Sequence, residues 1–304
     1  MSLLSLPNEL LLLIASHLPF PRDLYALTLP NKRLHTLLDP YLYKRDVVKN
    51  HSSVLLWASR HGHTIPAKKS LAAGGDPNTL ADVDEGPLHC ACNKGYAEIV
   101  DLLLAAPEVE PDLVSAHGQT PLCIAAMRGN VALARKLLGT GKVEVNKPAF
   151  GNFAPLGVAA AYGQAAMVQY LLSVPGIEPD LRNAGGYSAL TVAVNHWHAA
   201  AVELLAGVDG VDLEFPDQMG RSPLSVAASM GAVDVVRVLL ASGRVDVNSP
   251  DAAGETPLGW AAIYRKHEVV KVLLTVDGVD RSKLTERHLV ALGWESIPCG
   301  AQFE

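Results

Sequence analysis

Apolar residues recur along most of the chain in a pattern that repeats about every 34 residues. Seven segments share a Leu at the third place and an Ala at the sixth, and they begin at Ser53, Gly86, Thr120, Ala154, Ser188, Ser222 and Thr256. Within each repeat the apolar residues are spaced by three and four, which predicts two short helices per repeat. Such a constant interval predicts an array of stacked units that bury their apolar faces against one another.

The opening of a segment has the residues of a helix start. Thr120, Ser222 and Thr256 can cap the exposed N–H groups of a helix, and the Pro after each one fits the first helical position. Five of the seven segments end in Gly, for example Gly129 and Gly231, which permits the left-handed turn that stops a helix. The first helix of each repeat is therefore predicted to run from the Pro to the Gly.

A second apolar helix follows in each repeat, as at Leu133, Leu137 and Leu138. An extended polar stretch comes next and is clearest where it ends at Asn146 and at Asn248. Each repeat is thus predicted to be a helix, a turn, a second helix and a hairpin-like loop.

The segments resemble the ankyrin repeat, which opens with T-P-L-H-x-A-A and runs to about 33 residues. The resemblance covers residues 52–279, with departures: Val54 replaces Pro in the first unit, Ala189 and Trp197 replace Pro and Gly in the fifth, and Arg265 replaces Gly in the last. End units of a solenoid are expected to be irregular because one face meets water. The fifth unit is internal, and its departures have no explanation at this level.

The ankyrin resemblance implies a partner protein that binds to the loop tips and to the ends of the first helices, which line a concave face. The loop tips are His117, Phe150, Phe153, Tyr187, Met219, Arg221 and Glu255, and the helix ends are Asn93, Lys94, Met127, Arg128, Tyr162, His196, Met230 and Tyr264. Aromatic residues, Met and Arg are enriched in interface cores. The expected contacts are therefore Met127, Arg128, Phe150, Phe153, Tyr162, Tyr187, His196, Met219, Arg221 and Met230. Phe150 and Phe153 could equally pack against the neighbouring loop.

The first fifty residues break the period and need a separate interpretation. Their apolar pattern predicts one helix from Pro7 to about Leu18, a second from Asp23 to Leu29, and a third from Asn31 to Leu38. A three-helix piece this short and apolar rarely has a sufficient core of its own, so it either caps the first repeat or docks on a partner.

This N-terminal piece resembles the F-box, the helical module by which substrate adaptors attach to the Skp-type linker of a cullin ubiquitin ligase. The matching residues are Leu6, Pro7, Glu9, Leu10, Ile14, Leu18, Asp23, Leu24, Leu27, Leu34, Leu37 and Leu38, with the Tyr41 to Tyr43 tail. Leu34 stands where many F-boxes have Trp. The resemblance implies that the linker contacts Leu6, Pro7, Leu10, Ile14 and Leu24.

Composition narrows the class of function. The chain is 49% hydrophobic but only 6% aromatic, which suits small, closely packed helices, and its formal net charge of −6 argues against nucleic acid as the main ligand. The four cysteines, Cys90, Cys92, Cys123 and Cys299, lack the C-x-x-C spacing of a zinc or redox site and favour a reducing, intracellular setting. The apolar stretch from Leu156 to Val174 is too polar for a membrane span.

Chemical motifs in the repeats favour a structural interpretation. Residues 139–142 read GTGK, but the preceding Gly and the following Ser or Thr of a phosphate-binding loop are missing. His267 lacks the second His of a zinc-protease helix and is expected to start a helix. The pairs His61 with His63 and His196 with His198 have a spacing that would point the rings apart on a helix. No base and nucleophile stand outside the repeat pattern, so we expect no catalysis, no metal and no cofactor.

The sequence therefore predicts an all-α fold: an α-solenoid of about seven ankyrin repeats after a short three-helix F-box-like module. The expected domains are residues 1–50, 52–281 and a C-terminal capping segment, 282–304, in which Thr285 to Trp294 form one closing helix. The leading hypothesis is a cytoplasmic or nuclear adaptor that recruits a client protein to a cullin-type ubiquitin ligase and binds neither nucleic acid nor membrane. The alternative is an ankyrin scaffold or inhibitor whose N-terminal helices only cap the array.

Overall fold

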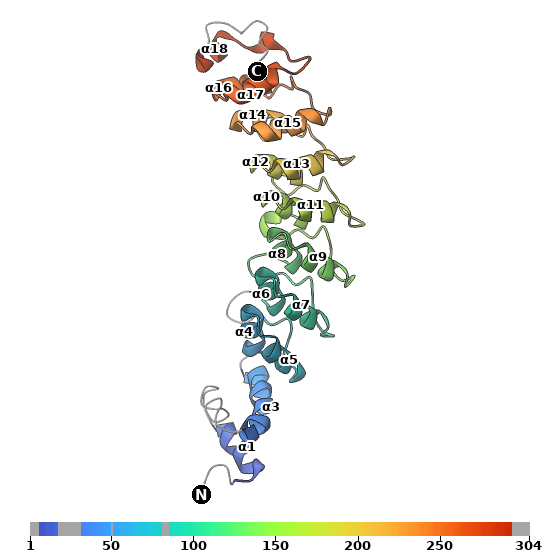
Figure 1. Cartoon of the computed structure of the whole chain (residues 1–304), viewed down its shortest axis with the longest axis vertical. Coiled ribbons are helices and arrows are strands. Elements are labelled where there is room, and N and C mark those ends of the chain that lie inside the picture. Colours follow the sequence, from blue (N-terminus) through green and yellow to red (C-terminus); the bar gives the residue numbers. More distant parts are fainter. Residues whose placement is uncertain (1–5, 18–31, 50, 81–84, 294–304) are drawn as a thin grey trace. The chain divides into compact units, whose positions relative to one another are not determined.

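The computed structural model describes residues 6–17, 32–49, 51–80 and 85–293, and all regular structure in them is helical (Figure 1), which confirms the predicted fold class. The N-terminal helices are α1 (Asn8–His17) and α3 (Lys32–Lys49). The first helices of the seven repeats are α4 (Ser53–His61), α6 (Pro87–Lys94), α8 (Pro121–Met127), α10 (Pro155–Ala161), α12 (Ala189–Asn195), α14 (Pro223–Met230) and α16 (Pro257–Ile263). The second helices are α5 (Thr64–Ala72), α7 (Ala97–Leu104), α9 (Val131–Leu138), α11 (Ala165–Leu172), α13 (Ala199–Ala206), α15 (Val233–Ala241) and α17 (His267–Leu274). Two 3₁₀ turns, Phe150–Asn152 and Arg281–Lys283, and α18 (Glu286–Leu292) complete the list.

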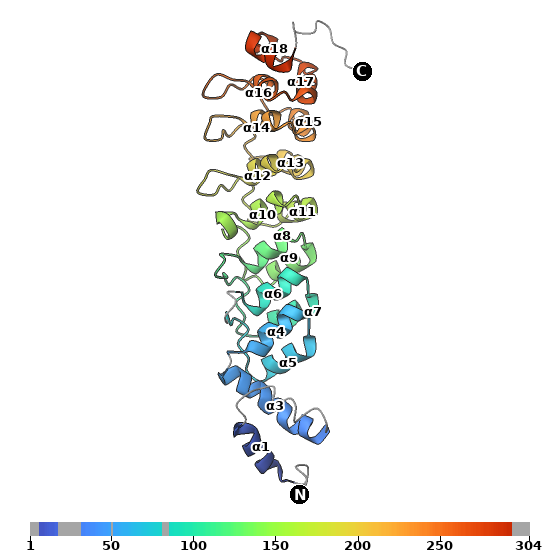
Figure 2. The same cartoon turned by 90° about the vertical axis from the view of Figure 1, so that its left-hand side faces the viewer.

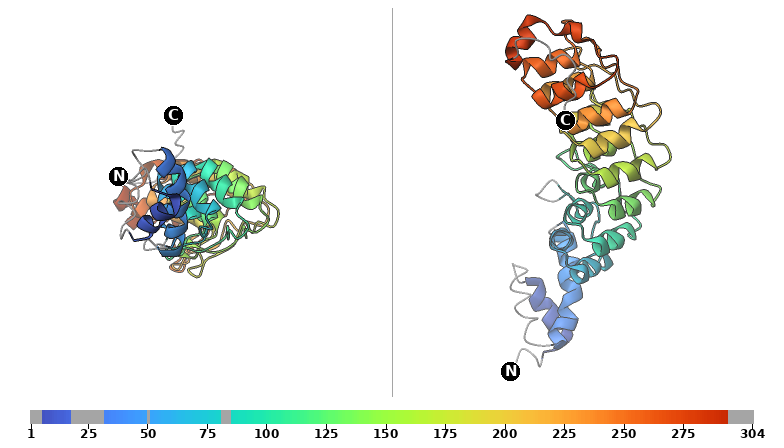
Figure 3. Two further views of the ribbon diagram at one scale, coloured as in Figure 1. Left: turned by 90° about the horizontal axis from the view of Figure 1, so that it is seen from below. Right: turned by 45° about the horizontal axis from the view of Figure 1, so that its top comes forward.

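The chain divides into two compact units, residues 1–125 with 132–143, and residues 126–131 with 144–304. In the first unit α4 packs on α5 and α6, and α6 packs on α7. In the second unit the first helices α10, α12, α14 and α16 form one row and the second helices α11, α13, α15 and α17 form another (Figure 3). The loops before α12, α14 and α16 project to the same side of this unit (Figure 2).

Helix starts follow the predicted chemistry. The Thr120, Ser222 and Thr256 hydroxyls accept hydrogen bonds from the backbone N–H groups of Cys123, Ser225 and Gly259 at 3.2, 3.3 and 3.2 Å. In the fifth repeat, where Pro is missing, Ser188 and Thr191 form a reciprocal capping box instead. The fifth repeat thus keeps the hydroxyl cap of these other repeats and adds a second capping bond, which the Thr191 hydroxyl accepts.

The turns between paired helices need a left-handed backbone, and the repeat Gly residues supply it with positive φ angles. Trp197 and Arg265 adopt the same conformation, with φ of 63° and 55°, at the two places where Gly is absent. The Gly turns are also crowded: a Cβ would lie within 3.0 Å of a side chain of the next repeat at Gly62, Gly129, Gly163 and Gly231, facing Tyr96, Gln164, His198 and Lys266.

The replacement of Gly by Trp197 is accompanied by a second substitution in the following repeat. The residue that corresponds to Gln164, His198 and Lys266 is Ala232 there, which has no long side chain to lie over the turn. Trp197 therefore fits at the turn and remains 54% exposed. Arg265 belongs to the seventh repeat, which is followed in the described residues by α18 instead of another helix pair.

Three asparagines at the ends of extended stretches tie their own repeat to the next one. The Asn146 amide donates to the Gly176 carbonyl at 2.7 Å and accepts from the Glu178 N–H at 3.1 Å. Asn248 makes the equivalent pair with Gly278 and Asp280 at 2.8 and 2.7 Å. Asn78 does the same in the first unit, with Glu108 and Glu110.

The array ends in α18, which packs on α16 and begins in a capping box between Thr285 and His288. Buried His288 holds the helix to the last loop, because its Nε2 donates to the Glu255 carboxylate at 3.1 Å while its Nδ1 accepts from the Thr285 N–H. The predicted closing helix is present within the expected range, whose last residue, Trp294, lies outside the described residues.

Candidate linker surface and protein-binding groove

Helix α1 presents two different faces. Leu11 is buried against Leu34 and Leu38 of α3, in a small core that also receives Leu6. Leu10 is 45% exposed and Ile14 is 36% exposed on the outer face. Leu13, 55% exposed, lies on the same face, because residues three and four apart share one side of a helix.

The predicted linker contacts thus fall into three groups. Leu10, Ile14 and the exposed Pro7 lie on the surface, whereas Leu6 is partly buried in the small core between α1 and α3. Leu24 and the whole predicted second helix, Asp23 to Leu29, lie outside the described residues. Leu13 was not predicted, although its position three residues after Leu10 was a usable signal.

Helix α3 is longer than predicted, since it continues through Pro40 to Lys49 instead of ending at Leu38. The helix packs on α4 and α5. Buried Asp46 accepts hydrogen bonds from the Ser53 hydroxyl at 2.6 Å and the Val54 N–H at 3.0 Å, at the start of α4. Asp39 pairs with Lys69 of α5 at 2.6 Å, and this bond raises the pKa of Lys69. Helix α3 therefore caps the first repeat.

The projecting loops of the second unit are shaped by residues 34 apart in the sequence. Asn183, Asp217 and Asp251 each accept, through one side-chain oxygen, two backbone N–H bonds of their own loop at 2.8 to 3.0 Å. This Asx turn fixes the loop tip. These residues were not predicted from the sequence, although their 34-residue spacing was visible.

A hollow of about 680 Å³ lies between the fourth and fifth repeats. Four of the predicted contacts line it: Phe153, Tyr162, Tyr187 and His196. Tyr162 and Tyr187 are 48% and 37% exposed. Asn183 and Asn195 add amide groups, and Val158 and Val192 add apolar surface.

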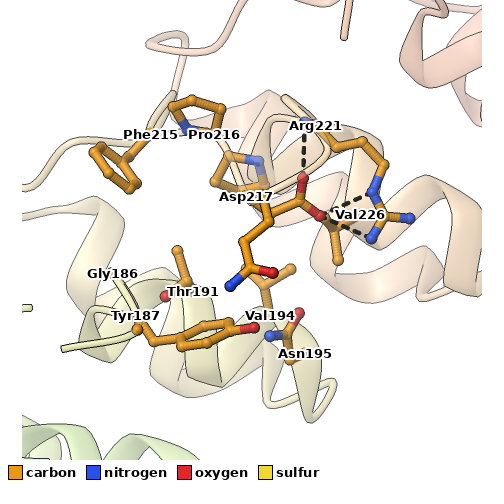
Figure 4. A pocket seen from close by; sticks show the side chains of 13 residues that line it. Gly186, Tyr187, Thr191, Val194, Asn195, Phe215, Pro216, Asp217, Arg221 and Val226 are labelled. Carbon is orange, nitrogen blue, oxygen red and sulfur yellow. Dashed lines mark hydrogen bonds and ion pairs between the residues drawn. The ribbon is translucent and has the colours of Figure 1, made fainter. Parts of the chain in front are cut away.

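A second hollow, of about 330 Å³, lies between the fifth and sixth repeats. Tyr187 and Asn195 line this hollow as well, opposite Phe215 and Asp217 of the next loop (Figure 4). Arg221 binds Asp217 with its backbone N–H, its Nε and its Nη2, at 2.9, 2.9 and 2.8 Å. Burial raises the pKa of Asp217, but the bonds from Arg221 and Met219 outweigh it and hold the pKa below its usual value.

The two hollows share Tyr187 and Asn195 and follow one another along α10, α12 and α14, and this surface is called the groove face. Phe153, Tyr187 and Arg221 occupy one repeat position and are 34 residues apart, so the periodicity predicted their alignment. Asn195 and Phe215 were missed. Asn195 stands at the repeat position of Met127, which was predicted, and the same logic extended by two repeats would have found it.

The other predicted contacts lie outside these hollows. Exposed Arg128 and Met219 and half-buried Met127 and Met230 line neither of them, and the Phe150 side chain lies outside the described residues. The Glu255 carboxylate is engaged by His288 and by the Thr256 N–H, so it is not available at the loop tip.

The histidine pairs differ from the prediction. The rings of His61 and His63 stack at 6.5 Å, and those of His196 and His198 at 6.2 Å, because a left-handed turn separates the two residues of each pair. In the described residues no group of three or more His, Cys, Asp or Glu could hold a metal ion. Burial raises the pKa of Cys92 to about 12, so this thiol is not a nucleophile at neutral pH.

Comparison with known proteins gives two family matches. A model described as ankyrin repeats (3 copies) matches residues 55–149, 156–251 and 190–285, and a model described as F-box-like matches residues 3–49. Comparison with curated proteins finds no match.

Two solved structures illustrate the fold. The ankyrin repeat domain of Bcl-3, described as a unique member of the IkappaB protein family, is 25% identical, with a TM-score of 0.63 over 73% of this chain and 98% of that one. The human ASB11 ankyrin repeat domain is 25% identical, with a TM-score of 0.65 over 75% of this chain and 99% of that one. Among the described helices, none has the length and apolar character needed to cross a bilayer.

Proposed function

Because the chain belongs to the ankyrin repeat proteins and carries an F-box-like module, we propose that it is a substrate adaptor that joins a client protein to a cullin-type ubiquitin ligase. Its family match supports the broader statement that it is a protein-interaction adaptor. In the proposed role α1 binds the Skp-type linker and the repeats bind the client. The adaptor itself catalyses no reaction.

The observation that carries this proposal is the outer face of α1. Leu10 and Ile14 remain exposed although the opposite face of the same helix is already packed on α3. A helix that leaves large apolar side chains in water is typical of a docking surface. The F-box resemblance assigns that surface to the linker.

A second candidate function is a scaffold or inhibitor with no ligase. The packing of α3 on the first repeat favours it, because Asp46 and Asp39 bind this helix to α4 and α5. Capping by α3 leaves the exposed face of α1 unexplained, so the adaptor remains the leading proposal.

The test is a binding measurement with a purified Skp-type linker. Wild-type chain is expected to bind, and Leu10→Asp to weaken binding about tenfold or more, because a charge would be buried against the linker. Val290→Asp, which changes an apolar residue that is 69% exposed on α18, is the matched control and should bind as wild type does. Circular dichroism should show equal helix content in all three. A wild-type chain that does not bind the linker would leave only the scaffold.

A further inference from the structure

The groove face offers a ligand almost no charge. Among the described residues that line the hollow between the fourth and fifth repeats, none is Asp, Glu, Lys or Arg. The next hollow has Asp217 and Arg221, and these two neutralise each other at 2.8 Å. A charged ligand side chain buried here would lose its hydration and find no counter-ion.

Two aromatic rings near the groove already contact arginine side chains of the chain itself. The Arg182 guanidinium lies 3.4 Å from the centre of the Phe215 ring, and Arg221 lies 5.5 Å from that of Trp260. These contacts satisfy the attraction of an aromatic ring for a cation. The exposed rings that remain in the groove are those of Tyr162, Tyr187 and His196, and the two tyrosine rings offer mainly apolar contact area.

One polar group stands in the middle of the groove. Asn195 lines both hollows, and its amide makes no hydrogen bond to any other described residue. An amide offers both donors and an acceptor, which matches the N–H and C=O of an extended peptide backbone. The hollow in the first unit is different, since Arg60, Glu85 and Lys94 line it.

We propose that the groove face binds an extended, uncharged and predominantly apolar segment of the client, with Asn195 paired to its backbone. This proposal rests on the client-binding role proposed above and adds the chemistry of the bound segment. The volumes of about 330 and 680 Å³ fall within the usual range for ligand sites, roughly 300–1,000 Å³. Apolar side chains would enter the two hollows on either side of Asn195.

The experiment selects a displayed library of random dodecapeptides on the full-length chain. The strongest binders are then synthesised and their affinities measured by fluorescence anisotropy. We expect them to share a run of uncharged, mainly apolar residues. Asn195→Asp should weaken their binding about tenfold or more, because it removes the amide donor and adds a charge. Gln169→Glu, an equal change of charge at an exposed position of the second helix α11, is the control and should leave the affinity unchanged.

Three results would overturn the proposal: binders rich in acidic or basic residues, equal affinity for the Asn195→Asp and Gln169→Glu variants, or no binders above background. Peptides that lose binding only with Leu10→Asp would belong to the α1 surface and would also count against the groove. The linker measurement is independent, so failure of the adaptor proposal and failure of this one are separate outcomes.

Discussion

At the residue scale, Trp197 shows how a substitution in one repeat is accommodated by the next. A left-handed non-Gly residue costs about 1 kcal/mol or more. Gln164 and His198 also donate to carbonyls of the preceding repeat, those of Met127 and Ala161, at 3.0 and 3.1 Å. Ala232 cannot make this bond. At this one junction the turn glycine and the long side chain that covers it in other repeats are therefore both missing, and Trp197 and Ala232 stand in their places.

This pairing predicts strong coupling between the two positions. Ala232→Gln is expected to destabilise the wild-type chain by about 1–3 kcal/mol, because the longer side chain would collide with Trp197. In a Trp197→Gly background the same change should be neutral or stabilising, since the introduced glutamine could then lie over the turn as Gln164 does. Urea unfolding of the four variants measures the coupling. Equal effects in both backgrounds would show that the residues are independent.

His89 predicts a pH dependence of stability. It is 1% exposed, its Nε2 donates to the Leu113 and Gln119 carbonyls at 2.9 and 3.1 Å, and burial lowers its pKa despite these bonds. A lowered folded pKa means that the unfolded chain binds the proton more tightly. The contribution of His89 to the free energy of unfolding is therefore fully present above the unfolded pKa of about 6.5. It is lost as the pH falls below that value.

The measurement is the melting temperature of wild type and His89→Gln between pH 8 and pH 5. Wild type should lose more stability over this interval than the variant, in which the titrating ring is absent. The other histidines contribute equally to both curves and cancel in the difference. Parallel curves would mean that His89 is not the group responsible.

Most helix caps and turns could be predicted from the sequence, because they depend on residues that are adjacent in the chain. Ser222 and Thr256 stand next to the helices they cap, and positive φ at Gly129 and Gly231 follows from the end of the segment. The pairing of Trp197 with Ala232 could not be predicted, since the compensation lies in the following repeat and is visible only once the repeats are stacked.

At the element scale, the helices owe their arrangement to contacts between repeats. Asn146 and Asn248 each bridge to the backbone of the next repeat with two hydrogen bonds. The corresponding residue after Asn146 is Asp180, which pairs with Arg182 at 2.7 Å and has no amide donor. The loops of successive repeats are therefore joined with unequal strength.

Asn146→Ala is expected to lower the free energy of unfolding by about 1–3 kcal/mol, because the Gly176 carbonyl and the Glu178 N–H both lose a partner. Gln169→Ala deletes an exposed amide from α11 and should change stability by less than about 0.5 kcal/mol. Urea unfolding followed by circular dichroism compares the two. A loss for Asn146→Ala no larger than for Gln169→Ala would show that the bridge contributes nothing.

Helix α3 shows why an element's end was harder to predict than its existence. Proline in a helix interior removes one hydrogen bond and usually ends the helix, so the pattern favoured an end before Pro40. Beyond Pro40, Asp46 anchors the helix to the start of α4, and this contact lies outside the local pattern. Tertiary packing outweighs a local preference here.

At the scale of the whole molecule, we propose that the two N-terminal helices have different roles, which the sequence left as alternatives. Helix α3 packs on the first repeat, and the exposed outer face of α1 is the proposed partner surface. In a repeat array each unit contacts only its neighbours, so damage at one end weakens the nearest repeat before the rest. The two tasks should therefore be separable by single substitutions.

Asp46→Ala tests this separation. The substitution removes the buried carboxylate that accepts hydrogen bonds from Ser53 and Val54. It also removes a negative charge near the start of α4, and the helix dipole favours a negative charge at that end. Amide hydrogen exchange should become faster in α4 and α5 while α14 and α15 keep their wild-type rates, and linker affinity at low temperature should be unchanged. Leu10→Asp should give the reverse, with normal exchange in α4 and α5 and weakened linker binding. Asp46→Asn keeps an acceptor for Val54 and should lie between Asp46→Ala and wild type. If either Asp46→Ala lost the linker or Leu10→Asp loosened the first repeat, the two helices would act as one unit, and capping and docking could not be assigned to different faces.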